Sequence, residues 1–179
     1  MRIGISCYST CGGSGVVATE VGKALAVRGH EVHILSPSLP PRLVGFEDRL
    51  CFHEVRASPY PLFEDAPYSI ALGSKMADVA DHYGLDILHA HYAIPHAMAA
   101  LLARMALPHL KVVTTLHGTD ITVVGSDPSY LPMVKMAIRE SDGVTAVSDT
   151  LVPAAVVAAY YGLTLAACGV PPAGDNDEQ

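Results

Sequence analysis

The sequence predicts an α/β fold with a Rossmann-like, mostly parallel, doubly wound sheet. Short apolar runs alternate with longer amphipathic segments along the chain. Most of these runs lack strict polar alternation, which is typical of strands that are buried on both faces. A glycine-rich stretch separates the first run from the first amphipathic segment. Because right-handed crossovers between parallel strands must cover the sheet, this β-α-β order predicts helices on both of its faces.

Each expected strand is a short apolar run that lies between helical or loop-like segments. The predicted strands are residues 2–8, 31–37, 50–55, 86–92, 111–117 and 143–148.

The longer segments have the periodicity of amphipathic helices. The first helix is expected to end at Gly29, which acts as a C-terminal cap. Its predicted apolar face consists of Val17, Val21, Ala24 and Leu25. A second helix is expected over residues 72–83, a third begins at Pro95 and ends before Pro108, and a fourth covers residues 128–139.

The chain of 179 residues is expected to form one Rossmann-like domain over residues 1–165, which is long enough to bury a sizeable core. Residues 36–49 and 56–68 are proline-rich and irregular, so they are predicted to be surface loops near strand ends. Residues 166–179 are expected to form a disordered tail.

Composition and charge argue against several classes of function. The net charge is −7, and Lys and Arg form no cluster, which argues against a nucleic-acid partner. The apolar stretches fall short of the ~20 residues that a membrane span needs. The N-terminus leads into the first strand without a signal-peptide core. We therefore expect a cytoplasmic protein with no membrane partner, and a homo-oligomer stays open.

The four cysteines, Cys7, Cys11, Cys51 and Cys168, form no C-x-x-C motif. In a reducing compartment they are expected to be buried small hydrophobic residues. A redox role for Cys7 and Cys11 is the alternative, because a helix N-terminus lowers the pKa of a nearby thiol.

The stretch between the first strand and the first helix is predicted to bind an anion. Ligands of a doubly wound sheet bind at the carboxyl ends of the strands, where this loop is expected. Gly12, Gly13 and Gly15 let the backbone approach a ligand closely, and the positive end of the helix dipole faces it. The hydroxyl of Ser14 adds a donor. A tight turn whose glycines serve packing alone is the alternative.

The spacing of this loop does not fit two common nucleotide-binding motifs. G-G-x-G differs from G-x-G-x-x-G, and the second strand ends without the acidic residue that would hold a ribose hydroxyl. A Walker loop is also absent, because no G-K-[ST] follows. An NAD, FAD or P-loop site is therefore not expected.

Three histidines, His89, His91 and His96, lie close together in the sequence. Because side chains alternate along a strand, His89 and His91 share one side, and a metal site with His96 is one interpretation. No Cys or acidic residue lies at a suitable spacing, so no metal is expected. Tyr92 and His96 are predicted instead to line a pocket at the carboxyl end of the strand.

The segment that follows the fifth strand is predicted to carry chemistry. The strand brings His117 to the carboxyl edge of the sheet, and Gly118 permits an unusual backbone turn. Thr119 and Asp120 follow as polar groups that are expected to face the same crevice. A histidine there can act as a hydrogen-bond partner or proton carrier for a hydroxyl, and a capping or core histidine is the alternative.

Five segments, in this order and with nearly this spacing, resemble the family-4 retaining glycosyltransferases, in particular those that begin bacillithiol biosynthesis. The segments are residues 11–33, 71–80, 86–97, 112–129 and 140–151. The resemblance implies the N-terminal, acceptor-binding half of a GT-B enzyme. It further implies that the acceptor is L-malate and that a C-terminal domain binds the donor UDP-N-acetylglucosamine across a cleft.

The resemblance also implies roles for single residues. Gly13, Ser14 and Gly15 would approach the donor diphosphate and the acceptor, and His117 would be the catalytic residue that positions the two substrates. The further substrate-binding candidates are Tyr92, His96, Thr119 and Asp120. Retention would follow from attack on the same face of the sugar, with the leaving phosphate accepting the proton. Neither a metal nor another cofactor is then expected.

Beyond residue 151 the sequence no longer resembles the family, and the expected C-terminal donor-binding domain is missing from the chain. We therefore expect this chain alone to be inactive. A binding-only remnant of the enzyme is the alternative, and another Rossmann-type small-molecule enzyme is the third interpretation.

Overall fold

The computed structural model describes residues 1–10, 13–43, 48–59 and 61–147. The expected tail at residues 166–179, the last part of the predicted domain, and Cys11, Gly12 and Cys168 lie outside these residues.

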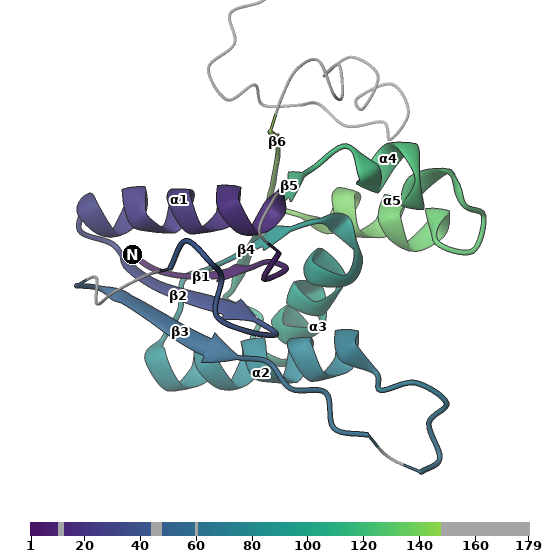
Figure 1. Ribbon diagram of the computed structural model, residues 1–179, viewed down its shortest axis with the longest axis horizontal. Helices are drawn as coiled ribbons and strands as arrows, with labels where there is room; N and C mark the ends of the chain where they lie inside the picture. Colours follow the sequence, from purple (N-terminus) through teal and green to yellow (C-terminus); the bar gives the residue numbers. More distant parts are fainter. Residues whose placement is uncertain (11–12, 44–47, 60, 148–179) are drawn as a thin grey trace, which may run out of the picture.

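The described residues form one six-stranded sheet in the order β3-β2-β1-β4-β5-β6, and every neighbouring pair is parallel (Figure 1). The prediction of a Rossmann-like, doubly wound α/β sheet is confirmed. The strands are β1 (Arg2–Ser6), β2 (Glu31–Ser36), β3 (Leu50–Glu54), β4 (Ile87–His91), β5 (Lys111–Leu116) and β6 (Gly143–Ala146). All six lie inside the predicted ranges and end one or two residues earlier than predicted.

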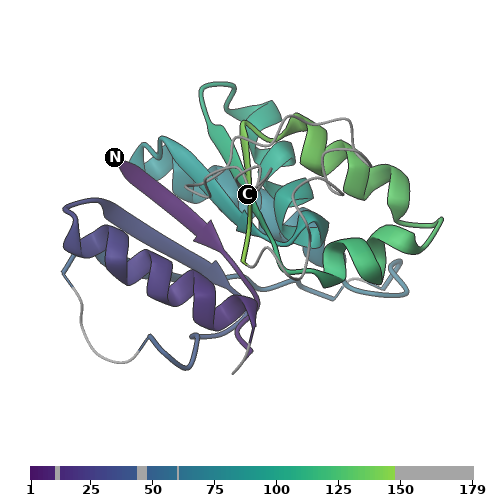
Figure 2. The same cartoon turned by 90° about the horizontal axis from the view of Figure 1, so that it is seen from above.

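The helices cover the two faces of the sheet. They are α1 (Ser14–Val27), α2 (Tyr68–Tyr83), α3 (Met98–Ala106), α4 (Thr119–Thr122) and α5 (Leu131–Glu140). Figures 1 and 2 show α1 alone on the face of β1, β2 and β3, with α2 and α3 on the other. The core is divided accordingly into a smaller cluster under α1 and a larger one under α2, α3 and α5.

The apolar face predicted for α1 is partly wrong. Ala24 is exposed, whereas Ala18, Gly22 and Ala26 are buried. A Cβ atom at Gly22 would lie 3.1 Å from Cδ1 of Ile34. Small residues bring α1 close to the sheet, so the branched side chains of the strands fill the space that larger helix residues would occupy. The predicted cap is confirmed, since Gly29 has a φ of +88° and donates its N–H to the Ala26 carbonyl.

The third helix starts close to the predicted position at Pro95. Regular α-helix is assigned from Met98, after a wide turn over Ala93–Ala97 in which only Ile94 has non-helical backbone angles, so helical backbone runs from Pro95 onward. Ile94 is extended, with φ −122° and ψ 133°, because the ring of a following proline disfavours helical backbone in the residue before it. The short helix α4 was not predicted, and α5 begins and ends slightly later than expected.

The two described cysteines differ from each other. Cys7 is buried, and burial raises the pKa of its thiol to about 12, which keeps the thiol protonated at neutral pH. Its side chain belongs to the core cluster under α1, as expected. Cys51, on the edge strand β3, is exposed, and the expectation that it is buried is wrong.

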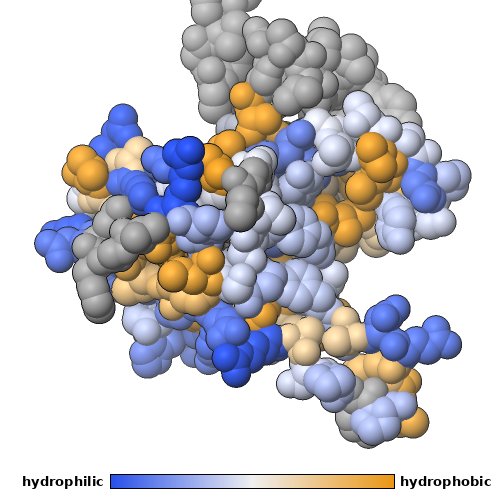
Figure 3. Space-filling model, in the orientation of Figure 1, coloured by the Kyte–Doolittle hydropathy of each residue, from blue (hydrophilic) through white to orange (hydrophobic). Residues whose placement is uncertain are grey.

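Hydrophilic and hydrophobic residues are interspersed on the face seen in Figure 3. Within the described ranges, no helix combines the length and apolar character needed to cross a membrane.

Candidate functional site

The strand order reverses between β1 and β4, because successive strands lead outward from this pair in opposite directions. Ligands of such sheets bind in the crevice at the carboxyl ends of the strands, where the order reverses. The segments that follow β1, β4 and β5 meet at this edge, and they contain all the predicted site residues.

Gly13 stands at the start of α1 with a φ of +60°, and no side chain caps the helix there. A Cβ atom at Gly13 would meet no other atom within 4 Å. The first backbone N–H groups of this 14-residue helix therefore lie beside open space. The positive end of the helix dipole lies at the same place. This geometry suits an anion.

Gly15 and Ser14 lie differently from Gly13. A Cβ atom at Gly15 would lie 2.6 Å from the carbonyl oxygen of Tyr8 and 2.7 Å from that of Thr10. A glycine is thus required at position 15 because α1 contacts the backbone of the preceding loop. This agrees with the alternative that the glycines of this turn serve packing. Ser14 is buried as well. Of the three predicted loop residues, only Gly13 is exposed.

A row of rings crosses the edge from β1 to β5, and we call His96, Tyr8, Tyr92 and His117 the aromatic row. The rings of Tyr8 and His96 meet edge to face, with centroids 4.7 Å apart. Tyr8 meets Tyr92 at 5.6 Å, and Tyr92 stacks on His117 at 4.8 Å with 29° between the planes. The predicted pocket residues Tyr92 and His96 therefore lie in one contact network with the predicted catalytic residue.

His117 is held by a second histidine from the neighbouring strand. Its Nε2 lies 3.0 Å from Nδ1 of His91, in a hydrogen bond across β4 and β5. Burial lowers the pKa of His117 to about 4 and that of His91 to about 2, so both imidazoles are neutral at pH 7. His117 is only partly buried, whereas His91 is fully buried.

Thr119 is exposed at the edge, as predicted. The prediction that Asp120 also faces the crevice is wrong. Its carboxylate is buried and accepts two backbone N–H groups, from Ala93 and from His117, each at 2.7 Å. Burial raises the pKa of this carboxyl group, and the backbone hydrogen bonds oppose the shift. Asp120 thus ties the segment after β5 to the segment after β4, because it satisfies a backbone donor on each.

Several buried polar atoms at this edge have no hydrogen-bond partner among the described residues. They are Ser6 Oγ, the Tyr68 hydroxyl, His91 Nε2 and both ring nitrogens of His96. Buried polar groups in folded proteins nearly always have partners, and an unpaired acceptor is tolerated better than an unpaired N–H donor.

The interpretation of His89, His91 and His96 as metal ligands is not supported by the geometry. In the part of the chain that the structure describes, no group of three or more His, Cys, Asp or Glu residues could hold a metal ion. His89 does share a side with His91, as predicted, and their ring centroids are 4.7 Å apart. Its Nε2 lies 2.6 Å from the hydroxyl oxygen of Thr115.

Sequence reasoning missed Tyr8 and the partnership of His91 with His117. Tyr8 directly follows the first strand at the point where ligands are expected, and this position was an available signal. No sequence signal identifies the His91 contact, which depends on the register of β4 against β5.

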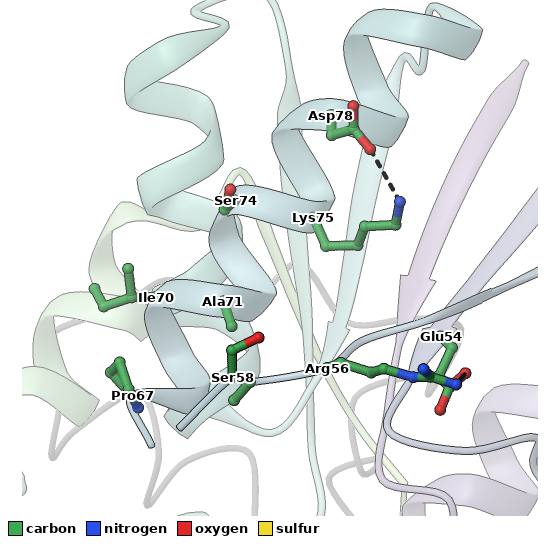
Figure 4. Close-up of a pocket in the computed structure, with 10 residues that line it drawn as sticks. Glu54, Arg56, Ser58, Pro67, Ile70, Ala71, Ser74, Lys75 and Asp78 are labelled. Atoms are coloured by element: carbon green, nitrogen blue, oxygen red, sulfur yellow. Dashed lines mark hydrogen bonds and ion pairs between the residues drawn. The ribbon is translucent and has the colours of Figure 1, made fainter. Parts of the chain in front are cut away.

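A separate groove of about 680 Å³ lies between the segment after β3 and α2 (Figure 4). Two ion pairs take up its charged side chains, Arg56 with Glu54 at 2.7 Å and Lys75 with Asp78 at 2.9 Å. Its lining therefore offers little unpaired charge to a ligand, and the carboxyl edge is the stronger candidate site.

Comparison with known proteins gives consistent results. Glycosyltransferase Family 4 matches residues 11–164. The chain is 54% identical over 153 residues to N-acetyl-alpha-D-glucosaminyl L-malate synthase of Bacillus anthracis, and the match covers 85% of this chain. The chain spans only 40% of the length of that relative.

Two solved structures have the same fold. A glycosyltransferase from Rickettsia africae has a TM-score of 0.64 at 20% identity, covering 91% of this chain and 40% of that one. Sucrose-phosphate synthase from Thermosynechococcus elongatus has a TM-score of 0.60 at 15% identity, covering 80% of this chain and 41% of that one. The fold matches one half of a GT-B glycosyltransferase, as predicted. Because the family match spans most of the sequence, the chain belongs to glycosyltransferase family 4.

Proposed function

We propose that this chain is the acceptor-binding half of an enzyme that transfers N-acetylglucosamine from UDP-N-acetylglucosamine to L-malate with retention. The observation that carries the proposal is the 54% identity, over 153 residues, to a relative named for this reaction. L-Malate is a dicarboxylate and the donor carries a diphosphate, so both substrates are anions.

The candidate site offers complementary groups for such substrates. The start of α1 beside Gly13 provides backbone donors and a positive dipole end for a carboxylate or phosphate. The neutral imidazole of His117 and the phenol of Tyr92 provide polar groups beside it. His96 and Asp120 are buried at the same edge. His96 packs against the ring of Tyr8, and Asp120 accepts backbone N–H groups from Ala93 and His117.

In the proposed reaction, the malate hydroxyl attacks the anomeric carbon on the face from which the diphosphate leaves. The bond from that carbon to the phosphate oxygen breaks as the bond to the malate oxygen forms, and the leaving phosphate accepts the hydroxyl proton. His117 orients the substrates and is not consumed. This sequence of steps uses no metal, cofactor or covalent enzyme intermediate.

Titration of the chain with L-malate, followed by calorimetry or by amide NMR shifts, tests the binding half of the proposal. We expect a dissociation constant no better than millimolar, with shifts confined to the segments after β1, β4 and β5. Succinate, which lacks the hydroxyl, should bind more weakly. Saturable binding of NAD or FAD would instead favour a different Rossmann-type enzyme.

Transfer is tested by mixing or fusing the chain with the C-terminal half of the Bacillus anthracis relative. A GT-B site is a cleft between two domains, and holding both substrates together is worth up to roughly 7–11 kcal/mol of the barrier. We expect no transfer by the chain alone and α-linked product when the second half is supplied. Malate binding without transfer in the fusion would favour the binding-only alternative, and product formation by the chain alone would contradict the division of labour proposed.

A further inference from the structure

The hydrogen bond between His91 and His117 bears on which ring nitrogens carry protons. It joins Nδ1 of His91 to Nε2 of His117 at 3.0 Å. Since both imidazoles are neutral, each ring carries one proton, and one proton lies in the shared hydrogen bond. The proton therefore belongs either to His91 or to His117, and the choice determines the state of the other two nitrogens.

In the first arrangement, His117 donates from Nε2. His91 must then carry its own proton on Nε2, and Nδ1 of His117 becomes an acceptor. In the second, His91 donates from Nδ1, its Nε2 carries no proton, and His117 carries its proton on Nδ1. Which nitrogen of a histidine is protonated is set by the hydrogen bond that the other nitrogen makes.

The surroundings of His91 distinguish the two arrangements. Its side chain is fully buried, and its Nε2 has no partner among the described residues. The first arrangement would bury an N–H group without an acceptor, and orphaned buried N–H groups are rarer than unsatisfied acceptors. The second arrangement leaves only a lone pair there.

We propose that His91 is a positioning residue that holds His117 in the Nδ1–H tautomer, so that His117 presents a hydrogen-bond donor to the crevice. Nδ1 is the ring nitrogen of His117 that takes no part in the hydrogen bond to His91, and the side chain is only partly buried. The site therefore recognises an oxygen acceptor at this point, such as a carboxylate, phosphate or hydroxyl oxygen.

This inference refines the proposed function and rests on it only for the identity of the ligand. An imidazole that is protonated on Nδ1 cannot accept the proton of the malate hydroxyl at that nitrogen. The departing phosphate then accepts this proton, and the role of His117 is to align the substrate. Asp120 holds the backbone of the same residue, since it accepts the N–H of His117 at 2.7 Å.

The tautomer can be measured in the chain itself without any substrate. Long-range proton–nitrogen correlation spectra of the ¹⁵N-labelled chain distinguish a protonated from an unprotonated ring nitrogen. We expect His117 with Nδ1 protonated and Nε2 unprotonated, and His91 in the same form. Exposed His109 serves as an internal reference and should show the Nε2–H form that predominates in free imidazole side chains. A His117 ring protonated on Nε2 would overturn the proposal, whatever the substrate is.

Three variants test whether His91 is the cause. His91→Phe removes both nitrogens, and His117 should then revert mainly to the Nε2–H form. His91→Asn keeps an amide donor close to the position of Nδ1, so the Nδ1–H form should persist. His89→Phe is the matched control, because it removes a half-buried imidazole that lies on the same strand and side and does not bond to His117. An unchanged His117 spectrum in His91→Phe would refute the role of His91. If that variant does not fold, the spectrum of the unmodified chain still decides the tautomer.

The fusion with the donor-binding half gives a second readout. His91→Phe should lower turnover about ten-fold or more, as expected for a misplaced donor to a charged group, and His91→Asn should restore most of it. Equal losses in both variants would show a packing role only. Absence of transfer in every fusion would contradict the proposed function and leave the tautomer result standing.

Discussion

At the scale of single residues, the candidate site divides into groups that face the crevice and groups that support them. Gly13, Tyr92, His117 and Thr119 are at least partly exposed at the carboxyl edge. Asp120 is buried and serves the backbone of two segments. The supporting groups should affect stability as well as activity, whereas the exposed ones should affect activity alone.

Replacing Asp120 tests this division. Asp120→Ala leaves two buried backbone N–H groups without an acceptor, and we expect it to lower the free energy of unfolding by about 2–5 kcal/mol. Thr119→Ala, at the neighbouring exposed position, should change it by less than about 0.5 kcal/mol. Urea denaturation of both variants measures the difference, and equal stabilities would show that the carboxylate does not hold the two segments together.

Gly15 provides a second test at this scale. A methyl group there would lie under 3.0 Å from two backbone carbonyl oxygens, which cannot move aside as a flexible side chain could. We expect Gly15→Ala to destabilise the fold by about 1–3 kcal/mol. Gly143→Ala is the control, since its nearest neighbour would be Cγ2 of Val113 at 3.8 Å, an ordinary contact. A thermal or chemical unfolding curve for Gly15→Ala that matches the parent would disprove the close contact.

At the scale of elements, the position of α1 depends on small residues. Ala18, Gly22 and Ala26 face the sheet, and the branched side chains of β1 and β2 fill the interface. This close approach places the start of α1 directly against the end of β1, where Tyr8 of the aromatic row lies. The position of the predicted anion-binding loop thus depends partly on the small residues along the sheet-facing side of the helix.

Leucine substitutions on the two sides of α1 should have opposite consequences. Gly22→Leu places a large side chain against Ile34 and should cost about 1–3 kcal/mol, despite the better helix propensity of leucine. Ala24→Leu lies on the exposed side and should change the stability by no more than about 0.5 kcal/mol. Circular dichroism during urea unfolding measures the stability of both variants. A larger loss of stability in Ala24→Leu would show that Ala24 lies on the buried face of α1, as the sequence predicted.

At the scale of the whole molecule, the fold concentrates neutral histidines. Burial lowers the pKa of His89, His117 and His53 to about 4 and that of His96 to about 3. The first two and His96 lie near the carboxyl edge, whereas His53 stacks on buried His33 between β2 and β3. The folded state therefore favours the neutral form of these imidazoles, in which each ring carries a single proton.

This distribution predicts the direction of the pH dependence of stability. The folded-state pKa values lie below the ordinary value of 6.5, so the unfolded chain binds more protons between pH 6.5 and 4. Stability should be fully present above pH 6.5 and should fall steadily as the pH drops toward 4. Urea midpoints at half-unit intervals would measure this, with His53→Phe expected to give a shallower slope. Stability that rises over the same interval would contradict the assignment.

The sequence by itself determined the six strands, their β-α-β succession and the family, because apolar runs, glycine caps and short motifs are local properties. It also predicted a candidate site in the segments after the first, fourth and fifth strands, since parallel sheets bind ligands at one known edge. Only the tertiary structure decided which side chains there meet. Asp120 reaches the backbone of Ala93, and His91 reaches His117, across 27 and 26 residues of sequence. These contacts depend on which strands are neighbours, on their register and on how closely α1 approaches the sheet. Such quantities come from the packing of the whole core, which no local pattern encodes.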